Sequence, residues 1–231
     1  MSISTAAAAE LAARWGGGSS VLAASPTGTG RKGLGAQCNA DAGVVTASKP
    51  HAAPADDAVL QATHTGAGSA ATCAVSLAFL LDFHDACVAP LQDRTQLSTQ
   101  QVVTDIIKPY TLDRRCRFAQ VVPAAVAPPT AQLTVFVSHA FGNPFSLLVA
   151  TLREHFANAV ATEVFVWVDV FAINQHDPSA DLLDGLVLSR TIELAAHTLV
   201  VLDRAALPMS RLWCLYEIGC TPPDKLLLLA A

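Results

Sequence analysis

The chain has 231 residues, of which 52% are hydrophobic, with a mean hydropathy of +0.41 and a net charge of −5. This length suits one ordinary domain with additional material, and the apolar content can fill a core although much of it is alanine. The negative charge lies in residues 131–231, which carry 5 Lys and Arg against 10 Asp and Glu. This half lacks the basic field that nonspecific nucleic-acid binding requires, so we expect no nucleic-acid partner.

The first 70 residues consist mainly of Ala, Gly, Ser, Thr and Pro, and they predict a disordered, low-complexity leader. Such a segment cannot bury enough apolar surface to offset the entropy of ordering. Residues 28–33 match the G-x-G-x-x-G pattern of dinucleotide loops, but no strand precedes them and no periodic helix follows. The Ser and Ala content with Arg14 leaves a transit peptide open as an alternative.

Residues 71–130 predict a short helical segment followed by a linker. The first expected helix has Leu77, Leu80, Leu81 and His84 at helical spacing. The second begins with a capping box at Ser98 and ends at Pro109, with an apolar face of Val102, Val103, Ile106 and Ile107. The basic residues of 112–117 indicate a solvated patch or a docking edge for the acidic half. Residues 123–129 are typical of a linker.

The cysteines indicate neither a disulfide framework nor a metal site. The six of them include no C-x-x-C pair, and no histidine lies at zinc-finger spacing. We therefore expect reduced thiols, no metal and a cytoplasmic location. The apolar run from Ala74 to Leu81 is too short to span a bilayer, so we expect no membrane partner.

Residues 131–231 alternate apolar runs with amphipathic segments. Strands are expected at 133–137, 164–168 and 198–202, with a fourth from 225, and helices at 145–156, at 181–197 and around Trp213. This alternation predicts an α/β fold with a parallel sheet covered on both faces. Right-handed crossovers order the four strands 2-1-3-4, with Phe136, Val166 and Val200 buried at the centre.

Ligands of such a sheet bind beyond the carboxyl ends of its strands, where Ser138, His139, Asp169 and Asp203 follow the apolar runs. A Ser138, His139 and Asp169 triad is disfavoured, because adjacent residues of an extended chain point to opposite faces.

The segment from Ser210 to Ile218 carries the most specific pattern of the chain. On a helix, Ser210, Trp213 and Glu217 project from one face. The adjoining stripe, expected to pack on the core, contains Leu212, Leu215, Tyr216 and Gly219. A carboxylate beside an indole can perform chemistry, and the alternative is a solvated surface glutamate.

Three motifs resemble Toll/interleukin-1 receptor (TIR) domains. Residues 135–142, Val-Phe-Val-Ser-His-Ala-Phe-Gly, resemble the opening strand and loop of this family, and residues 166–169 resemble its second strand. Residues 210–218 are similar to the Ser-x-x-Trp-Cys-Leu-x-Glu-Leu box of plant TIR domains. The opening is also similar to a TIR-like group with Ser-His-Ala-Trp-Gly, where this chain has Phe141 for Trp. The resemblance covers roughly residues 133–230.

The resemblance implies a flavodoxin-like sheet and cleavage of NAD⁺ at the nicotinamide–ribose bond, with NAD⁺ as substrate and no cofactor. The catalytic glutamate of the family falls on Glu217, and the expected substrate-binding residues are Ser138, His139, Phe141, Asp169, Ser210 and Trp213. It also implies homo-oligomers, or assembly with other TIR-like domains, through the loop of about residues 171–181.

Two features depart from the TIR pattern. Against that pattern we expect an incomplete domain, because the fourth strand is incomplete and the fourth helix and fifth strand of the family have no counterpart in the sequence, and the assembly loop lacks its usual Gly. The alternatives are therefore a non-catalytic interaction or self-association module, or an inactive fragment.

Overall fold

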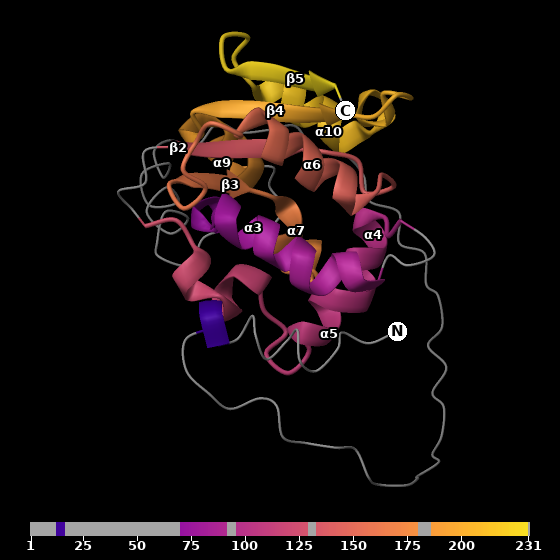
Figure 1. Ribbon diagram of the computed structural model, residues 1–231. Coiled ribbons are helices and arrows are strands. Elements are labelled where there is room, and N and C mark those ends of the chain that lie inside the picture. The colour runs from indigo at the N-terminus through magenta and orange to yellow at the C-terminus, as the bar shows by residue number, and fades with distance from the viewer. Residues whose placement is uncertain (1–12, 17–69, 92–95, 129–132, 180–185, 231) are drawn as a thin grey trace, which may run out of the picture.

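A mixed five-stranded sheet with the order β1-β3-β2-β4-β5 organises the protein (Figure 1). In the computed structural model, the described residues are 13–16, 70–91, 96–128, 133–179 and 186–230. The strands are β1 Val75–Ser76, β2 Leu133–Ser138, β3 Val164–Trp167, β4 His197–Leu202 and β5 Leu226–Ala230. Strands β2 to β5 are mutually parallel, whereas β1 is antiparallel to β3.

The expected α/β class and strand order are confirmed. In chain order the four parallel strands lie 2-1-3-4, which is the arrangement of flavodoxin-like sheets. Phe136, Val166 and Val200 are fully buried, as expected for strands covered on both faces. The ring of Phe136 stacks on Trp167 of the neighbouring strand, with 4.8 Å between centroids.

Helices connect the parallel strands. They are α6 Phe145–His155, α7 Asp169–Ala172, α9 Leu186–Leu194 and α10 Leu212–Cys220, the last preceded by the 3₁₀ turn η7 Leu207–Ser210. The expected end of α9 at residue 197 is wrong, because His197 already pairs with Val135 as the first residue of β4. The expected start of this helix, residues 181–185, lies outside the described residues.

The segment before β2 is helical, as predicted, with wider turns than the sequence indicated. Helix α3, Leu77–Phe83, is capped by the hydroxyl of Ser76 and continues as the π-helix η2, His84–Val88. Helix α4, Thr99–Val102, begins with the expected capping box and continues as the π-helix η4, Val103–Ile107. The expected stop at Pro109 is wrong, since α5 extends over Lys108–Tyr110. The N–H of Lys108 bonds back to the carbonyl of Val103, and this wide turn accommodates the proline ring.

Residues 123–128 do not form the expected linker. Pro123–Ala125 is a 3₁₀ turn with Ala125 buried, and the N–H of Ala127 donates to the carbonyl of Ala74 at 2.8 Å. Val126 also forms a bridge with Val75, so this stretch is fixed beside β1. These backbone hydrogen bonds fix a stretch that its proline-rich composition predicted to be flexible.

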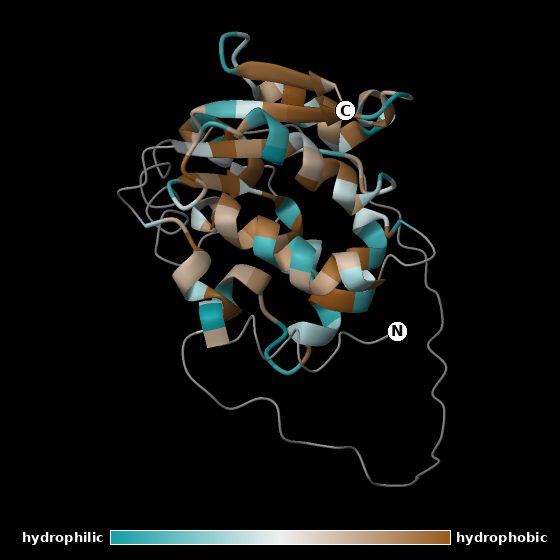
Figure 2. Ribbon diagram, viewed as in Figure 1, coloured by the Kyte–Doolittle hydropathy of each residue, from teal (hydrophilic) through white to brown (hydrophobic). Residues whose placement is uncertain are grey.

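One aromatic cluster joins the helical segment to the sheet. Phe83 lies 5.1 Å from Phe171, 5.5 Å from Phe118 and 6.0 Å from Phe145, measured between ring centroids. Figure 1 shows α3 alongside β3, and Figure 2 shows apolar residues concentrated in the strands. The expected segments 71–130 and 131–231 therefore share one hydrophobic core.

Residues 13–16 are the only part of the expected leader before Ala70 that the structure describes. Trp15 packs edge-on against Phe79, with 5.8 Å between ring centroids, and Arg14 forms an ion pair with Asp82. The rest of the expected leader lies outside the described residues. None of the helices in the described ranges has both the length and the apolarity needed to cross a bilayer.

Candidate functional site

Ser138 and Glu217 meet where the central strand β2 ends. The hydroxyl of Ser138 donates a hydrogen bond of 2.5 Å to Oε2 of Glu217 from α10. Ser138 is the last residue of β2 and is 1% exposed, while Glu217 is 7% exposed. This contact lies at the carboxyl edge of the sheet, which is where parallel sheets place their ligand sites.

Burial changes the ionisation of Glu217. Desolvation raises the pKa of its carboxyl group to about 8, and the charge of Asp169 adds to this rise. The hydrogen bond from Ser138 acts in the opposite direction, because it stabilises the carboxylate. The surface-glutamate alternative is therefore wrong, since this carboxyl group is buried and partnered by a hydroxyl.

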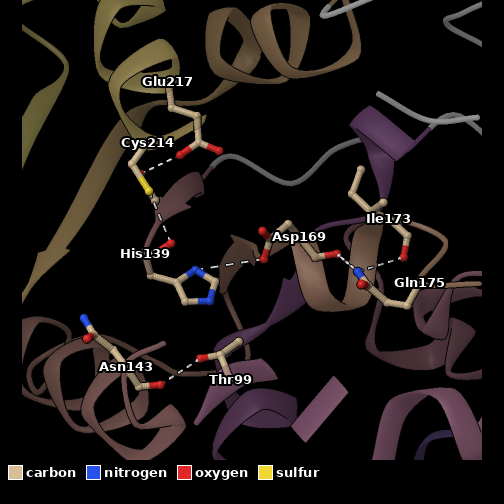
Figure 3. Close-up of polar contacts among 9 residues, drawn as sticks. Thr99, His139, Asn143, Asp169, Ile173, Gln175, Cys214 and Glu217 are labelled. Atoms are coloured by element: carbon tan, nitrogen blue, oxygen red, sulfur yellow. Dashed lines mark hydrogen bonds and ion pairs between the residues drawn. The ribbon is translucent and has the colours of Figure 1, made fainter. Parts of the chain in front are cut away.

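His139 and Asp169 lie beside this contact, at the ends of β2 and β3. Nδ1 of His139 is 3.9 Å from Oδ1 of Asp169, which is longer than a hydrogen bond (Figure 3). Burial lowers the pKa of His139, against the opposing charge of Asp169, so we treat the ring as neutral near pH 7. Burial likewise raises the pKa of Asp169. Nε2 of His139 is buried and has no hydrogen-bond partner in the structure.

Asp169 is held by the first turn after β3. Its carbonyl accepts a 2.9 Å hydrogen bond from Nε2 of Gln175, which also donates to the carbonyl of Ile173 (Figure 3). The same loop is fixed to the helical segment, because Nε2 of His176 is 2.9 Å from Oγ1 of Thr111 and Asn174 donates to the carbonyl of Arg115. Asn174 and His176 of the expected assembly loop thus contact the turn that follows α5 Lys108–Tyr110.

Cys214 and Thr221 are two site residues that sequence reasoning missed. Sγ of Cys214 donates to the carbonyl of His139 at 3.4 Å, and burial raises the pKa of this thiol to about 11 (Figure 3). Thr221 donates to the carbonyl of Glu217 at 2.8 Å and contacts Thr198 of β4. Cys214 and Thr221 lie three residues before and four residues after Glu217, and this spacing identifies the buried face of α10.

The expected common face of Ser210, Trp213 and Glu217 is wrong. Ser210 belongs to η7, is exposed and donates to the carbonyl of Leu207. Trp213 is 48% exposed and packs edge-on against Tyr216, whereas Glu217 points into the protein. The expected core stripe is also wrong, because Leu212, Leu215, Tyr216 and Gly219 are exposed.

Among the hydrogen bonds of the described residues, none joins Phe141 or Asp203 to Glu217, but each of these two residues fixes a neighbouring part of the chain. The ring of Phe141 stacks on His139 with 5.5 Å between centroids, and its carbonyl accepts a hydrogen bond from the N–H of Gln100. The carboxylate of Asp203 accepts from the backbone N–H groups of Ala205 and Leu207, and these bonds lower its pKa. Asp203 therefore fixes the turn that leads into η7 and α10.

In the described ranges, no group of three or more His, Cys, Asp or Glu residues is arranged to hold a metal ion. The side chains brought together are those of Ser138, His139, Asp169, Cys214 and Glu217. They define an α/β protein with a buried carboxyl group at the carboxyl edge of its sheet. Comparisons with protein-family models, with curated proteins and with solved structures found no match for this chain. The TIR resemblance stays a prediction from the motifs.

Proposed function

We propose that the protein is a TIR-like NAD⁺ glycohydrolase in which Glu217 is the catalytic carboxylate. The observation that carries this proposal is the Ser138–Glu217 hydrogen bond, because it joins two residues of the TIR-like motifs at the ligand edge of the sheet. We place this activity in the cytoplasm, because the cysteine spacing of the sequence indicates no disulfide framework.

The proposed reaction needs one carboxylate and no metal. The bond between ribose C1′ and the nicotinamide nitrogen breaks, its electron pair stays on nicotinamide, and positive charge develops on the ribose. A carboxylate beside the ribose stabilises that charge, as in glycoside hydrolysis. Water then bonds to C1′ and releases a proton. The products are nicotinamide and ADP-ribose.

Only the ionised form of Glu217 can provide this stabilisation. With a pKa of about 8, roughly a tenth of the molecules carry the carboxylate at pH 7. Ser138 stabilises that form by its hydrogen bond, and the positive charge of the nicotinamide ring stabilises it further. Binding of the cationic substrate therefore increases the ionised fraction of Glu217. The reaction needs this negative charge when positive charge develops on the ribose.

In the structure the carboxyl group of Glu217 is buried, and the substrate must reach it. Glu217 is 7% exposed, so the proposal requires that NAD⁺ binding open an approach to it. The side chain of Asp169 is 28% exposed as a whole, while its oxygen Oδ1 is buried and has no hydrogen-bond partner in the structure. We assign it to the binding of a substrate hydroxyl, with His139 beside it.

The test is release of nicotinamide from NAD⁺, followed by chromatography. The wild-type chain should produce nicotinamide, and Glu217→Gln should lower kcat on the order of a hundredfold, because the amide keeps the shape and loses the charge. Glu154→Gln, a change at an exposed glutamate of α6, is the matched control and should retain activity. An inactive wild type, or equal activity of the wild type and Glu217→Gln, would contradict the proposal.

A further inference from the structure

Three cations gather at α5 and in the turn that follows it. Residues 108–117 carry four Lys or Arg and one Asp, in a chain whose net charge is −5. Arg114 and Arg115 are exposed, and Lys108 is half-buried. The ion pairs formed within the described residues include none of these three side chains. We call Lys108, Arg114 and Arg115 the cation cluster.

Hydrogen bonds hold this turn at the ligand edge of the sheet. Nδ2 of Asn174, in the loop after α7, donates to the carbonyl of Arg115 at 2.9 Å. The next residue, Gln175, donates to the carbonyl of Asp169 at 2.9 Å (Figure 3). The loop after α7 therefore contacts the turn through Asn174 and the candidate site through Gln175.

The charge of the cluster acts on this loop. Nε2 of His176 is 2.9 Å from Oγ1 of Thr111, whose own hydrogen goes to the carbonyl of Ile107, so His176 is the donor. Burial lowers the pKa of His176, and the charges of Arg115 and Lys108 lower it further. Both cations therefore lie close enough to act on one group of the loop.

Arg115 belongs to a fixed turn. Its φ of 45° lies in the left-handed region, which residues other than glycine rarely adopt. Its N–H donates to the carbonyl of Thr111 at 2.8 Å, and its own carbonyl accepts from Asn174. Because both backbone groups are held, the arginines are presented by an ordered backbone, and less entropy is lost when they bind a ligand.

We propose that Lys108, Arg114 and Arg115 bind the diphosphate of NAD⁺, beside the carboxyl groups that face its ribose. The inference rests on the proposed function and adds residues from outside the TIR-like motifs. Guanidinium groups bind phosphate oxygens with two parallel hydrogen bonds, and an ammonium group adds a third positive charge.

Charge favours a diphosphate as the ligand of the cluster. NAD⁺ carries its positive charge on the nicotinamide ring and its negative charges on the diphosphate. Asp169 and Glu217 suit the nicotinamide ribose, but carboxyl groups do not attract phosphates. The diphosphate therefore needs cations next to these carboxyl groups, and the loop after α7 places the cluster there.

The test is isothermal titration calorimetry of ADP-ribose into the whole chain, which measures binding without turnover. Arg114→Gln and Arg115→Gln should each raise the dissociation constant on the order of tenfold, because each removes a charge-assisted contact with phosphate. Arg115→Lys keeps the charge and should bind with intermediate affinity. Arg190→Gln removes the same charge from α9, where Arg190 pairs with Glu193, and this matched control should bind as the wild type does.

Kinetics provide a second measurement. Arg115→Gln should raise KM for NAD⁺ and leave kcat nearly unchanged, because the diphosphate is held equally in the ground state and the transition state. Circular dichroism checks that the variants fold, and Lys108→Gln replaces any arginine variant that does not. Inorganic diphosphate should bind more weakly than ADP-ribose, since it lacks the sugars that face the carboxyl groups.

Four results would overturn the proposal. They are a wild type that does not bind ADP-ribose, equal affinity of the wild type and the folded cluster variants, a loss of affinity caused by Arg211→Gln instead, and inorganic diphosphate bound as tightly as ADP-ribose. Failure of the proposed function gives a different result. A wild type that leaves NAD⁺ intact but binds ADP-ribose through Arg114 and Arg115 contradicts the glycohydrolase and supports the diphosphate site.

Discussion

Ser138 and Glu217, 79 residues apart in sequence, share a hydrogen bond of 2.5 Å inside the protein. The hydroxyl is delivered by the central strand and the carboxyl by the last helix, so the contact exists only when the sheet is assembled. Burial suppresses the charge of this carboxyl group, and the hydrogen bond from Ser138 partly stabilises it.

The rate of NAD⁺ cleavage should increase with pH. Because the pKa of Glu217 is raised to about 8, the catalytic carboxylate forms only as the pH passes through that region. We expect kcat/KM to rise about tenfold for each pH unit below this pKa and to level off above it. Initial rates of nicotinamide release across the neutral and alkaline range provide the measurement. A rate that falls with rising pH would contradict the assignment of an ionised Glu217.

Ser138→Ala should move this pH profile in the alkaline direction. The hydrogen bond from Ser138 lowers the pKa of Glu217, so its loss leaves burial and Asp169 unopposed. Activity near neutral pH should fall and should recover at higher pH. Thr221→Val is the control, because Thr221 donates to the backbone carbonyl of Glu217 and not to its carboxyl group. If both variants show the wild-type midpoint, Ser138 does not tune the carboxylate.

The free energy of unfolding should decrease as the pH rises from 4.5 to about 8, because of the buried carboxyl group of Glu217. Its pKa is raised from the ordinary value of 4.5 to about 8, so between these values the folded protein holds a proton that the unfolded chain has released. The free energy of unfolding should fall by up to about 1.4 kcal/mol per pH unit there. Glu217→Gln should remove this slope, while Glu154→Gln should keep it. Urea unfolding from pH 5 to pH 8 measures both slopes, and equal slopes for the wild type and Glu217→Gln would contradict the prediction.

His139 should produce a loss of stability on the acidic side. Its pKa is lowered from 6.5, mainly by burial and against the charge of Asp169, so protons bind the unfolded chain preferentially below that value. This contribution opposes that of Glu217, so below pH 6.5 the wild type should gain less stability with falling pH than His139→Gln does. Unfolding midpoints at neutral and mildly acidic pH test this, and an equal pH dependence of the two proteins would exclude His139 as the cause.

Trp213→Ala should have little effect on the fold or on catalysis. The half-exposed indole contacts Tyr216, whereas the carboxyl group of Glu217 is buried, so removal of the indole should cost about 1 kcal/mol. Trp167→Ala is the contrast, because Trp167 is fully buried against Phe136 and its loss should cost about 4 kcal/mol. Thermal or urea unfolding compares the two. A loss of NAD⁺ cleavage in Trp213→Ala would show that the indole reaches the substrate.

The sheet was predictable from sequence because its strands are continuous apolar runs. Residues 133–137, 164–168 and 198–202 were expected as strands, and β2, β3 and β4 lie there within one residue at each end. Strand β1 was not predictable, since two residues carry no periodicity. Its pairing depends on β3, almost a hundred positions later in the chain.

The site was predictable in position and not in orientation. Ser138, His139 and Asp169 follow apolar strands, so their gathering at one edge of the sheet follows from topology. The orientation of α10 was predicted wrongly, because helical patterns assume that leucines are buried and carboxylates are exposed. Here Ser138 stabilises a buried Glu217, and Leu212 is left in solvent. A pattern of residues within α10 cannot predict that Ser138, 79 residues earlier in the chain, donates a hydrogen bond to Glu217.

The hydrogen bond between Trp167 of β3 and Ala70 joins two positions that are synthesised at different times on the ribosome. The indole N–H of Trp167 donates to the carbonyl of Ala70, a partner made 97 residues earlier. At about 5–20 residues per second, translation of that interval takes roughly ten seconds. For most of it, the phenylalanines of α3 have been synthesised while Phe171, which contacts both of them, has not. The nascent chain thus carries an unpaired edge and bare aromatic rings until β3 emerges, which makes this interval the one in which chaperone binding matters most.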